Sequence, residues 1–262
     1  MSAATERLEA LLQLMRRLRD PQQGCPWDRE QDFASIAPHT IEEAYELDDA
    51  IAGGSPDRIR DELGDLLFQV VFHAQMASER GWFDFAAVAA SVHDKLVRRH
   101  PHVFGDATPD GTADLSRAWD QAKAAERATA GERRALAGVA VALPALSRAA
   151  KLARRAGAVG FDWFNEQAVR PKIAEELRET EQAIAGGDPA AIEEELGDTL
   201  FALANWARLL GVDPENALRG ANRKFERRFS AMEGLMAQRG WKAADLSAAQ
   251  WDELWVSVKS AE

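Results

Sequence analysis

Apolar residues recur along the chain at the spacing of α-helices. In the second half the steps between successive apolar positions are four, four, three, four and three residues, at Ile192, Leu196, Leu200, Leu203, Ala207 and Leu210. Such a series places the side chains on one face of a helix. No stretch of the sequence shows the alternation of apolar and polar residues that marks a β-strand. The pattern therefore predicts an all-α protein.

Turn residues divide this pattern into separate helices. Helix starts are indicated where an N-cap residue precedes proline, at Ser55-Pro56, Asp188-Pro189 and Asp213-Pro214. Helix ends are indicated at Gly53-Gly54 and Gly186-Gly187. Each half is thus expected to contain an antiparallel helix pair joined by a short turn, with further helices completing a small bundle.

One segment of the sequence occurs twice. Residues 50–68 and 183–201 are identical at 13 of 19 positions, with an offset of 133 residues. A repeat of that length is the size of a domain and too long for a solenoid unit. We therefore expect two tandem helical-bundle domains, at residues 1–127 and 141–262, joined by an Ala/Gly-rich linker at 128–140.

Acidic residues are spaced three apart on both helices of each expected pair. They are Glu43, Glu46, Glu62 and Asp65 in the first copy and Glu176, Glu179, Glu195 and Asp198 in the second. Residues three apart share a helix face, and a hairpin turn brings the two faces together. Carboxylates that converge in this way repel one another unless cations lie between them. Each copy therefore offers a candidate metal site.

Oxygen ligands without histidine or cysteine favour Mg²⁺, with Mn²⁺ as a substitute. The competing interpretation is a pair of solvated, Glu-rich helix faces. The recurrence of all four acidic positions in both copies favours the metal site. Gly64 and Gly197 lie within helices, where glycine costs about 1 kcal/mol relative to alanine, so we expect another helix or a ligand to approach closely there.

Basic and aromatic residues follow each acidic hairpin at a spacing of four. They are Lys224 with Arg228 and Trp255 with Lys259 in the second copy, and Lys95 with Arg99 and Trp119 with Lys123 in the first. If these residues face the carboxylates, they provide a phosphate-binding group and a surface on which a base can stack. The alternatives are solvated cations and tryptophans of the core.

These motifs resemble the signature of the MazG family, which comprises all-α nucleoside triphosphate pyrophosphohydrolases. The similarity rests on "EEAYE…ELGD" and "EELRE…ELGD", and it extends to "RLRDPQQGCPWDREQDF", "RRHPHVF", "VGFDW" and "NRKFERRF". These segments span nearly the whole chain, as in the two-domain members of the family. The resemblance implies that a homodimer hydrolyses a nucleoside triphosphate to the monophosphate and pyrophosphate with magnesium.

The resemblance also implies roles for particular residues of the second copy. Metal ligands fall on Glu176, Glu179, Glu195 and Asp198, and nucleotide contacts fall on Lys172, Lys224, Arg228 and Trp255, with Lys259 as a further candidate. Glu179 and Glu195 are equal candidates for the catalytic proton acceptor, and attack at the α- or the β-phosphorus gives the same products. Stacking on an aromatic ring discriminates poorly among bases, so we expect a broad substrate range that suits removal of unwanted nucleotides.

The first copy departs from this pattern at one position, where His39 replaces Lys172. Histidine is mostly neutral at pH 7, so the first copy lacks a permanent cation there. In the two-domain proteins that the sequence resembles, turnover is associated with the second domain. We therefore expect the second domain to be catalytic and the four acids of the first to form a candidate second metal site.

The amino-acid composition disfavours several classes of function. The chain has 262 residues, of which 46% are hydrophobic and 29% charged, as in globular proteins. Its 43 acidic and 32 basic residues give a net charge of −11, which disfavours binding to nucleic acid or anionic membranes. One cysteine and no membrane-spanning apolar run predict a cytoplasmic protein. The alternative function is that of a helical regulatory protein that binds nucleotide or metal without turnover.

Overall fold

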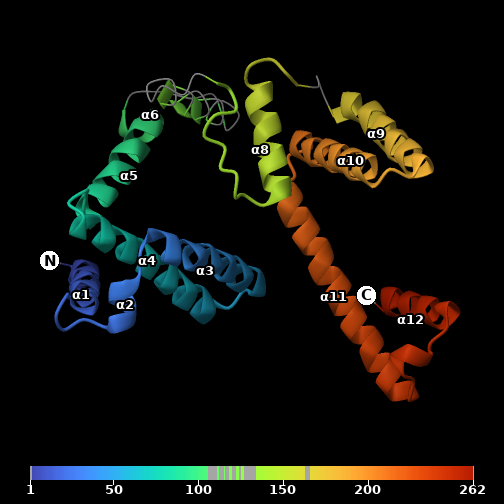
Figure 1. The fold of residues 1–262 in the computed structure, drawn as a ribbon, viewed down its shortest axis with the longest axis horizontal. Coiled ribbons are helices and arrows are strands. Elements are labelled where there is room, and N and C mark those ends of the chain that lie inside the picture. The colour runs from blue at the N-terminus through green and yellow to red at the C-terminus, as the bar shows by residue number, and fades with distance from the viewer. Residues whose placement is uncertain are drawn as a thin grey trace. The chain divides into compact units, whose positions relative to one another are not determined.

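The computed structural model describes residues 2–105, 134–162 and 166–261, and single positions between 111 and 126. All regular elements among these residues are helices, which confirms the all-α prediction (Figure 1). The chain forms two compact units, Met1–Ala124 and Ala125–Glu262. Residues 128–133 of the expected linker lie outside the described residues.

The first unit is built around the expected helix pair. Its helices are α1 (Ala3–Leu18), α2 (Pro26–Glu30), α3 (Phe33–Gly53), α4 (Pro56–Glu79), α5 (Phe85–Arg99) and α6 (Pro101–Phe104). Helix α3 packs along α4, and α1 covers the later turns of α4. The core between them consists of Met15, Ile36, Val71, Phe72 and Met76.

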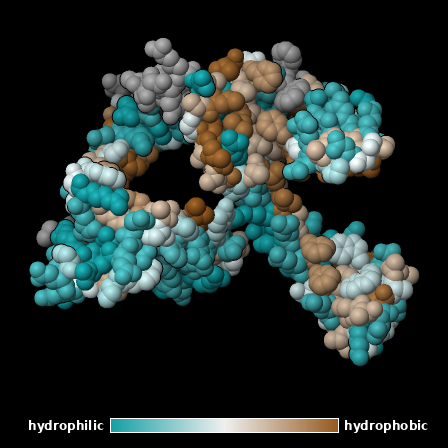
Figure 2. Space-filling view, in the orientation of Figure 1, coloured by the Kyte–Doolittle hydropathy of each residue, from teal (hydrophilic) through white to brown (hydrophobic). Residues whose placement is uncertain are grey.

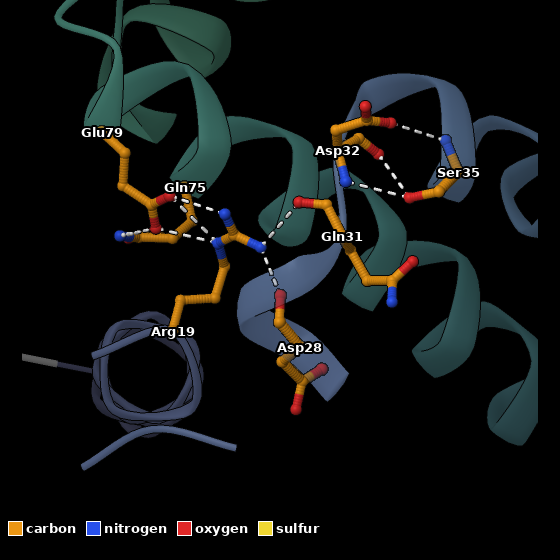
Figure 3. Close-up of polar contacts among 7 residues, drawn as sticks. All are labelled: Arg19, Asp28, Gln31, Asp32, Ser35, Gln75 and Glu79. Carbon is orange, nitrogen blue, oxygen red and sulfur yellow. Dashed lines mark hydrogen bonds and ion pairs between the residues drawn. The ribbon is translucent and has the colours of Figure 1, made fainter. Parts of the chain in front are cut away.

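Arg19 ties the segment after α1 to the end of α4 (Figure 3). Its guanidinium donates to both carboxylate oxygens of Glu79 at 2.7 to 3.1 Å, and to the backbone carbonyls of Asp28 and Gln31. The Arg19 side chain is only 8% exposed, so these acceptors replace the water that the charged group has lost. The contact fixes α2 next to the start of α3, the helix that carries Glu43.

The second unit contains a similar pair of helices. Its elements are α8 (Ala145–Gly157), α9 (Glu166–Gly186), α10 (Pro189–Leu209), α11 (Pro214–Arg239), the 3₁₀-helix η1 (Ala243–Asp245) and α12 (Ala248–Ser260). Helix α9 packs along α10, whose later part contacts α8, and α12 packs against α11. A separate core between α11 and α12 consists of Met232, Met236, Leu254 and Val258.

The two hairpin turns have the expected end signals. Gly54 and Gly187 adopt left-handed backbone angles, with φ of +69° and +71°, which only glycine adopts without strain. The Ser55 hydroxyl accepts a hydrogen bond from the Arg58 amide, and the Asp188 carboxylate caps α10 in the same way. Local sequence therefore positions the two acidic helices of each unit side by side.

Two features differ from a simple bundle. A Cβ atom added at Gly64 or Gly197 would meet no atom of the described chain within 4 Å, so neither glycine is required by a neighbouring helix of this chain. The apolar face expected along α10 is also largely uncovered, since Leu196, Leu200 and Leu210 are about half exposed. No helix in the described part of the chain is long and apolar enough to cross a membrane.

Candidate metal and nucleotide site

The carboxylates of the second unit converge as the spacing predicts for a metal site. Helix α9 carries Glu176 and Glu179, and α10 carries Glu195 and Asp198. Oxygens of Glu176, Glu179 and Glu195 lie within 4.8 Å of one another, and Glu176 is buried at 6% exposure. Asp198 is outside this group of three but close enough to raise the pKa of Glu195. The arrangement offers a cation three or four oxygens from two helices.

The first unit has an equivalent cluster between α3 and α4. There the group of three consists of Glu43, Glu62 and Asp65, again with oxygens within 4.8 Å of one another. Glu46 lies outside the group but contributes to the raised pKa of Glu43. Both duplicated sites therefore keep a compact set of hard oxygen donors.

Burial and mutual repulsion act on both clusters. Burial is the largest cause that raises the pKa of Glu195, followed by the charges of its acidic neighbours, Glu179 first. The pKa of Glu43 is raised by burial and then by Asp65, Glu46 and Glu62. Burial and like-charge repulsion both disfavour the charged carboxylates, and a divalent cation between them would offset both effects.

The contribution of Glu195 to the stability of the metal-free protein is expected to fall as the pH rises above about 4.5. The raised pKa of Glu195 means that the folded state holds a proton after the unfolded chain has released it, so the free energy of unfolding falls as the pH passes through the folded pKa. Mg²⁺ at about 100 times its dissociation constant should reverse the loss and add about 2.7 kcal/mol. Thermal unfolding against pH, with and without Mg²⁺, measures both effects.

Glu195→Gln is the comparison that isolates this carboxyl, because glutamine cannot titrate. Its unfolding temperature should depend less on pH than that of the wild type, and should rise less with Mg²⁺. Identical profiles for the two proteins would contradict a shared, cation-seeking cluster.

The two sites differ in whether a lysine lies beside the carboxylates. The Lys172 ammonium lies 2.8 Å from a Glu176 oxygen and 3.1 Å from Glu175, and these contacts raise the pKa of Lys172. His39, at the equivalent position, contacts Glu42 at 3.3 Å and an edge of Trp27. The second site thus holds a lysine on one of its predicted metal ligands, and the first site does not.

Four of the expected nucleotide-binding residues lie on α11 and α12, whereas Lys172 lies on α9 beside the carboxylates. Arg228 of α11 stacks 5.5 Å above the ring of Trp255 from α12, and Lys224 and Lys259 are exposed. Trp255 also packs against the α11–α12 core, so its ring is half-buried. Arg228 and Trp255 are therefore in contact with each other, while the carboxylates form a separate cluster on α9 and α10.

The same pairing of arginine and tryptophan recurs in the first unit. Arg99 lies 5.0 Å above the ring of Trp119, and the ammonium of Lys123 lies 4.8 Å from it. Lys95 is half-buried on α5, one turn before Arg99. Both units therefore combine an all-α acidic hairpin with a separate cationic, aromatic group, an arrangement expected of a metal-dependent phosphate-ester or anhydride hydrolase.

Comparisons with known proteins identify this class more closely. Residues 31–104 and 164–231 each match the family described as "MazG nucleotide pyrophosphohydrolase domain". The chain is 49% identical over 257 residues to a nucleoside triphosphate pyrophosphohydrolase of Escherichia coli, covering 97% of this chain and 98% of that protein. It is 43% identical over 254 residues to the "nucleoside triphosphate pyrophosphohydrolase/pyrophosphatase MazG" of Thermotoga maritima, covering 97% and 96%.

The chain therefore belongs to the MazG nucleotide pyrophosphohydrolase family. The family and hydrolase class predicted from the sequence motifs are confirmed, as are two family domains in tandem.

Sequence analysis missed one residue beside the first cluster. Gln69 follows Asp65 by one turn of α4 and is buried at 5% exposure, and its amide contacts Glu43. The signal was present, since an amide four residues after a ligand shares its helix face. A search for residues shared by the two copies does not find Gln69, because the equivalent residue of the second copy is Ala202.

Proposed function

We propose that the chain hydrolyses nucleoside triphosphates to monophosphates and pyrophosphate with a divalent cation bound in the second unit. The observation that carries this proposal is the cluster of Glu176, Glu179 and Glu195 in a chain of the MazG family. Asp198 completes the proposed ligand set, and Mg²⁺ is the proposed metal, with Mn²⁺ as a substitute.

The donor atoms fit such a cation. All are carboxylate oxygens, which hard cations prefer, and no histidine or cysteine belongs to the group. When bound, a divalent cation neutralises triphosphate charge and makes water a stronger nucleophile.

The remaining residues bind and orient the triphosphate. Lys172 can exchange Glu176 for a phosphate oxygen, since its ammonium already lies at the edge of the cluster. Lys224 and Arg228 bind other phosphate oxygens, and Trp255 stacks on the base, with Lys259 as an additional cation. Such a stacking contact supports a broad range of bases, as removal of unwanted nucleotides requires.

In the hydrolysis, the water oxygen forms a bond to either the α-phosphorus or the β-phosphorus. The bond between that phosphorus and the oxygen that bridges the two phosphorus atoms is broken. Glu179 or Glu195 accepts the proton that water releases, and the electron pair of the broken bond stays with the leaving phosphate. The raised pKa of Glu195 does not separate the two candidates, because a bound cation would itself favour the charged form of either carboxyl.

A homodimer is the proposed assembly. Leu196 and Leu200 on α10, with Leu210 at its C-cap, expose an apolar row that a second copy would cover. Figure 2 shows further apolar surface around α8 and the start of α11. We place the enzyme in the cytoplasm and propose neither nucleic acid nor a membrane as partner, since the net charge is −11.

The proposal is tested by measuring pyrophosphate release from a panel of nucleoside triphosphates with Mg²⁺ and with excess EDTA. Release that requires Mg²⁺ and occurs with several bases is the expected result. Nucleotide binding without release under any condition would instead support the regulatory alternative.

Trp255→Ala is expected to raise KM more than it lowers kcat, by a factor that corresponds to about 1 to 3 kcal/mol. A stacked base is held about equally in the ground and transition states, so its loss weakens binding without slowing chemistry. Steady-state kinetics measure the separation, and thermal unfolding reports any loss of core packing.

Trp255→Phe is the control for Trp255→Ala, because phenylalanine keeps an aromatic face and much of the packing. It should retain most of the affinity. If both variants bind nucleotide normally and only the alanine variant is less stable, Trp255 is a core residue alone.

A further inference from the structure

Four aromatic side chains form two pairs between α11 and α12. Phe229 lies nearly parallel to Trp251, with ring centroids 6.1 Å apart and an angle of 14° between the planes. Phe225, one turn earlier on α11, meets Trp255 at 5.9 Å, but the planes of these two rings are tilted by 44°. The Phe225–Trp255 pair is therefore tilted open, whereas the Phe229–Trp251 pair is stacked.

Phe225 is the more exposed of the two phenylalanines. Its exposed fraction is 56%, against 37% for Phe229. Both tryptophans also pack against the core between α11 and α12, whereas Phe225 rests on the ring of Phe229 at 6.0 Å. An aromatic ring that stays in water gains little of the stabilisation that burial gives. Packing within the second unit therefore leaves a large part of the Phe225 ring available for contact.

Two cations lie beside this open pair. Lys224 directly precedes Phe225, and the Arg228 guanidinium lies 5.5 Å over the Trp255 ring. A guanidinium is attracted to an aromatic face, and it also binds phosphate oxygens in a bidentate manner. The proposed function assigns a phosphate to Arg228 and the base to Trp255. Nucleotide binding would therefore move the guanidinium from the ring to the phosphates and leave its place to the base.

The first unit lacks the second ring. Arg99 lies 5.0 Å over Trp119, so an arginine and a tryptophan are in contact there as well. Three residues before the arginine, however, the first unit has Leu96 where the second unit has Phe225. A leucine side chain has no π-face on which a base could stack. The additional ring is thus specific to the unit with the proposed turnover.

We propose that Phe225 is a second aromatic contact for the base and that it makes the site favour purines over pyrimidines. The base binds against Trp255 as Arg228 turns to the phosphates, and Phe225 packs on the base from α11. The fused rings of a purine can contact both side chains, whereas the single ring of a pyrimidine covers less of them. Differences in stacking strength give modest preferences of this kind. The proposal rests on the proposed function, which places the base at Trp255.

Equilibrium binding to the full-length protein with Mg²⁺ tests the proposal, measured by isothermal titration calorimetry. The probes are non-hydrolysable analogues of adenosine and cytidine triphosphate, with inorganic triphosphate as the probe that lacks a base. Phe225→Leu, which introduces the first-unit residue, should weaken binding of the adenosine analogue by at least about 5-fold, the lower end of the usual range for loss of a stacking ring. Binding of the cytidine analogue should weaken less. Binding of inorganic triphosphate should stay at the wild-type level, because Lys224 and Arg228 are unchanged.

Two further variants separate base recognition from packing. Phe225→Tyr keeps an aromatic face and should restore both the affinity and the purine preference. Phe229→Leu is the matched control, since it removes a ring one turn away on the same helix, from the pair that is already stacked. It should lower the unfolding temperature and leave the ratio of the two nucleotide affinities unchanged.

Several results would overturn the proposal. Equal losses of affinity for the nucleotide analogues and for inorganic triphosphate would make Phe225 a packing residue. Unchanged affinities in Phe225→Leu would mean that the base does not contact the ring, and dissociation of an oligomer in that variant with unchanged affinities would mean that a second copy covers it. Pyrophosphate release is measured separately, so the expected binding pattern without release would count against the proposed function alone.

Discussion

Glu195→Gln is expected to lower kcat/KM for pyrophosphate release by at least about 100-fold, because loss of an outer-shell partner of a metal already costs 10- to 100-fold. Glu195 is one of three carboxylates with converging oxygens and is proposed as a direct ligand. Glutamine has nearly the same size and helix propensity, so α10 should remain folded. Initial rates with excess Mg²⁺, together with circular dichroism, measure activity and folding.

Glu193→Gln is the matched control, since it removes an exposed carboxylate two residues away on α10. Residues two apart point about 200° from one another around a helix, so Glu193 faces away from the cluster and its loss should leave the rate unchanged. Excess chelator should abolish wild-type activity, and added Mg²⁺ should restore it. Full turnover in chelator, or in Glu195→Gln, would mean that the acidic cluster is a solvated surface.

The features that sequence predicted well depend on residues near one another in the chain. A capping hydroxyl at Ser55 and a left-handed glycine at Gly54 act over one helical turn, so the sequence is sufficient to locate the hairpin. The convergence of Glu43 with Glu62 followed from that hairpin and two spacings of three. Even the Lys172–Glu176 contact is an i,i+4 pair that sequence contains.

The features that sequence could not predict are contacts between distant segments. Arg19 and Glu79 are 60 residues apart, and neither residue carries a local sign of the other. The pairing of Arg228 with Trp255 depends on how α12 folds back on α11, whereas sequence spacing suggested Trp255 with Lys259. The apolar face of α10 was correctly placed on the helix, but periodicity does not say whether the same chain or a second copy covers it.

Glu176→Ala and Glu43→Ala should have very different effects on activity. Both residues begin an acidic quartet, and both belong to a compact group of three carboxylates. Only Glu176 is held by a lysine, at 2.8 Å, whereas the equivalent His39 contacts Glu42. Lysine keeps its charge at pH 7 and can transfer to a triphosphate that carries about four negative charges, whereas histidine with a pKa of about 6.5 is mostly neutral.

We therefore expect Glu176→Ala to remove at least about 90% of pyrophosphohydrolase activity and Glu43→Ala to remove less than about half. The role that we propose for Glu43 is metal binding in the first unit, so its variant should lose part of the Mg²⁺-dependent thermal stabilisation. Initial rates at saturating Mg²⁺ and nucleotide, compared with unfolding temperatures of the same samples, separate the two roles. If each substitution halves the rate, the two sites are equivalent and Lys172 does not distinguish them. If Glu43→Ala lowers the rate only in proportion to the protein that unfolds, the first unit supports the enzyme through its stability, and turnover belongs to the site that contains the lysine.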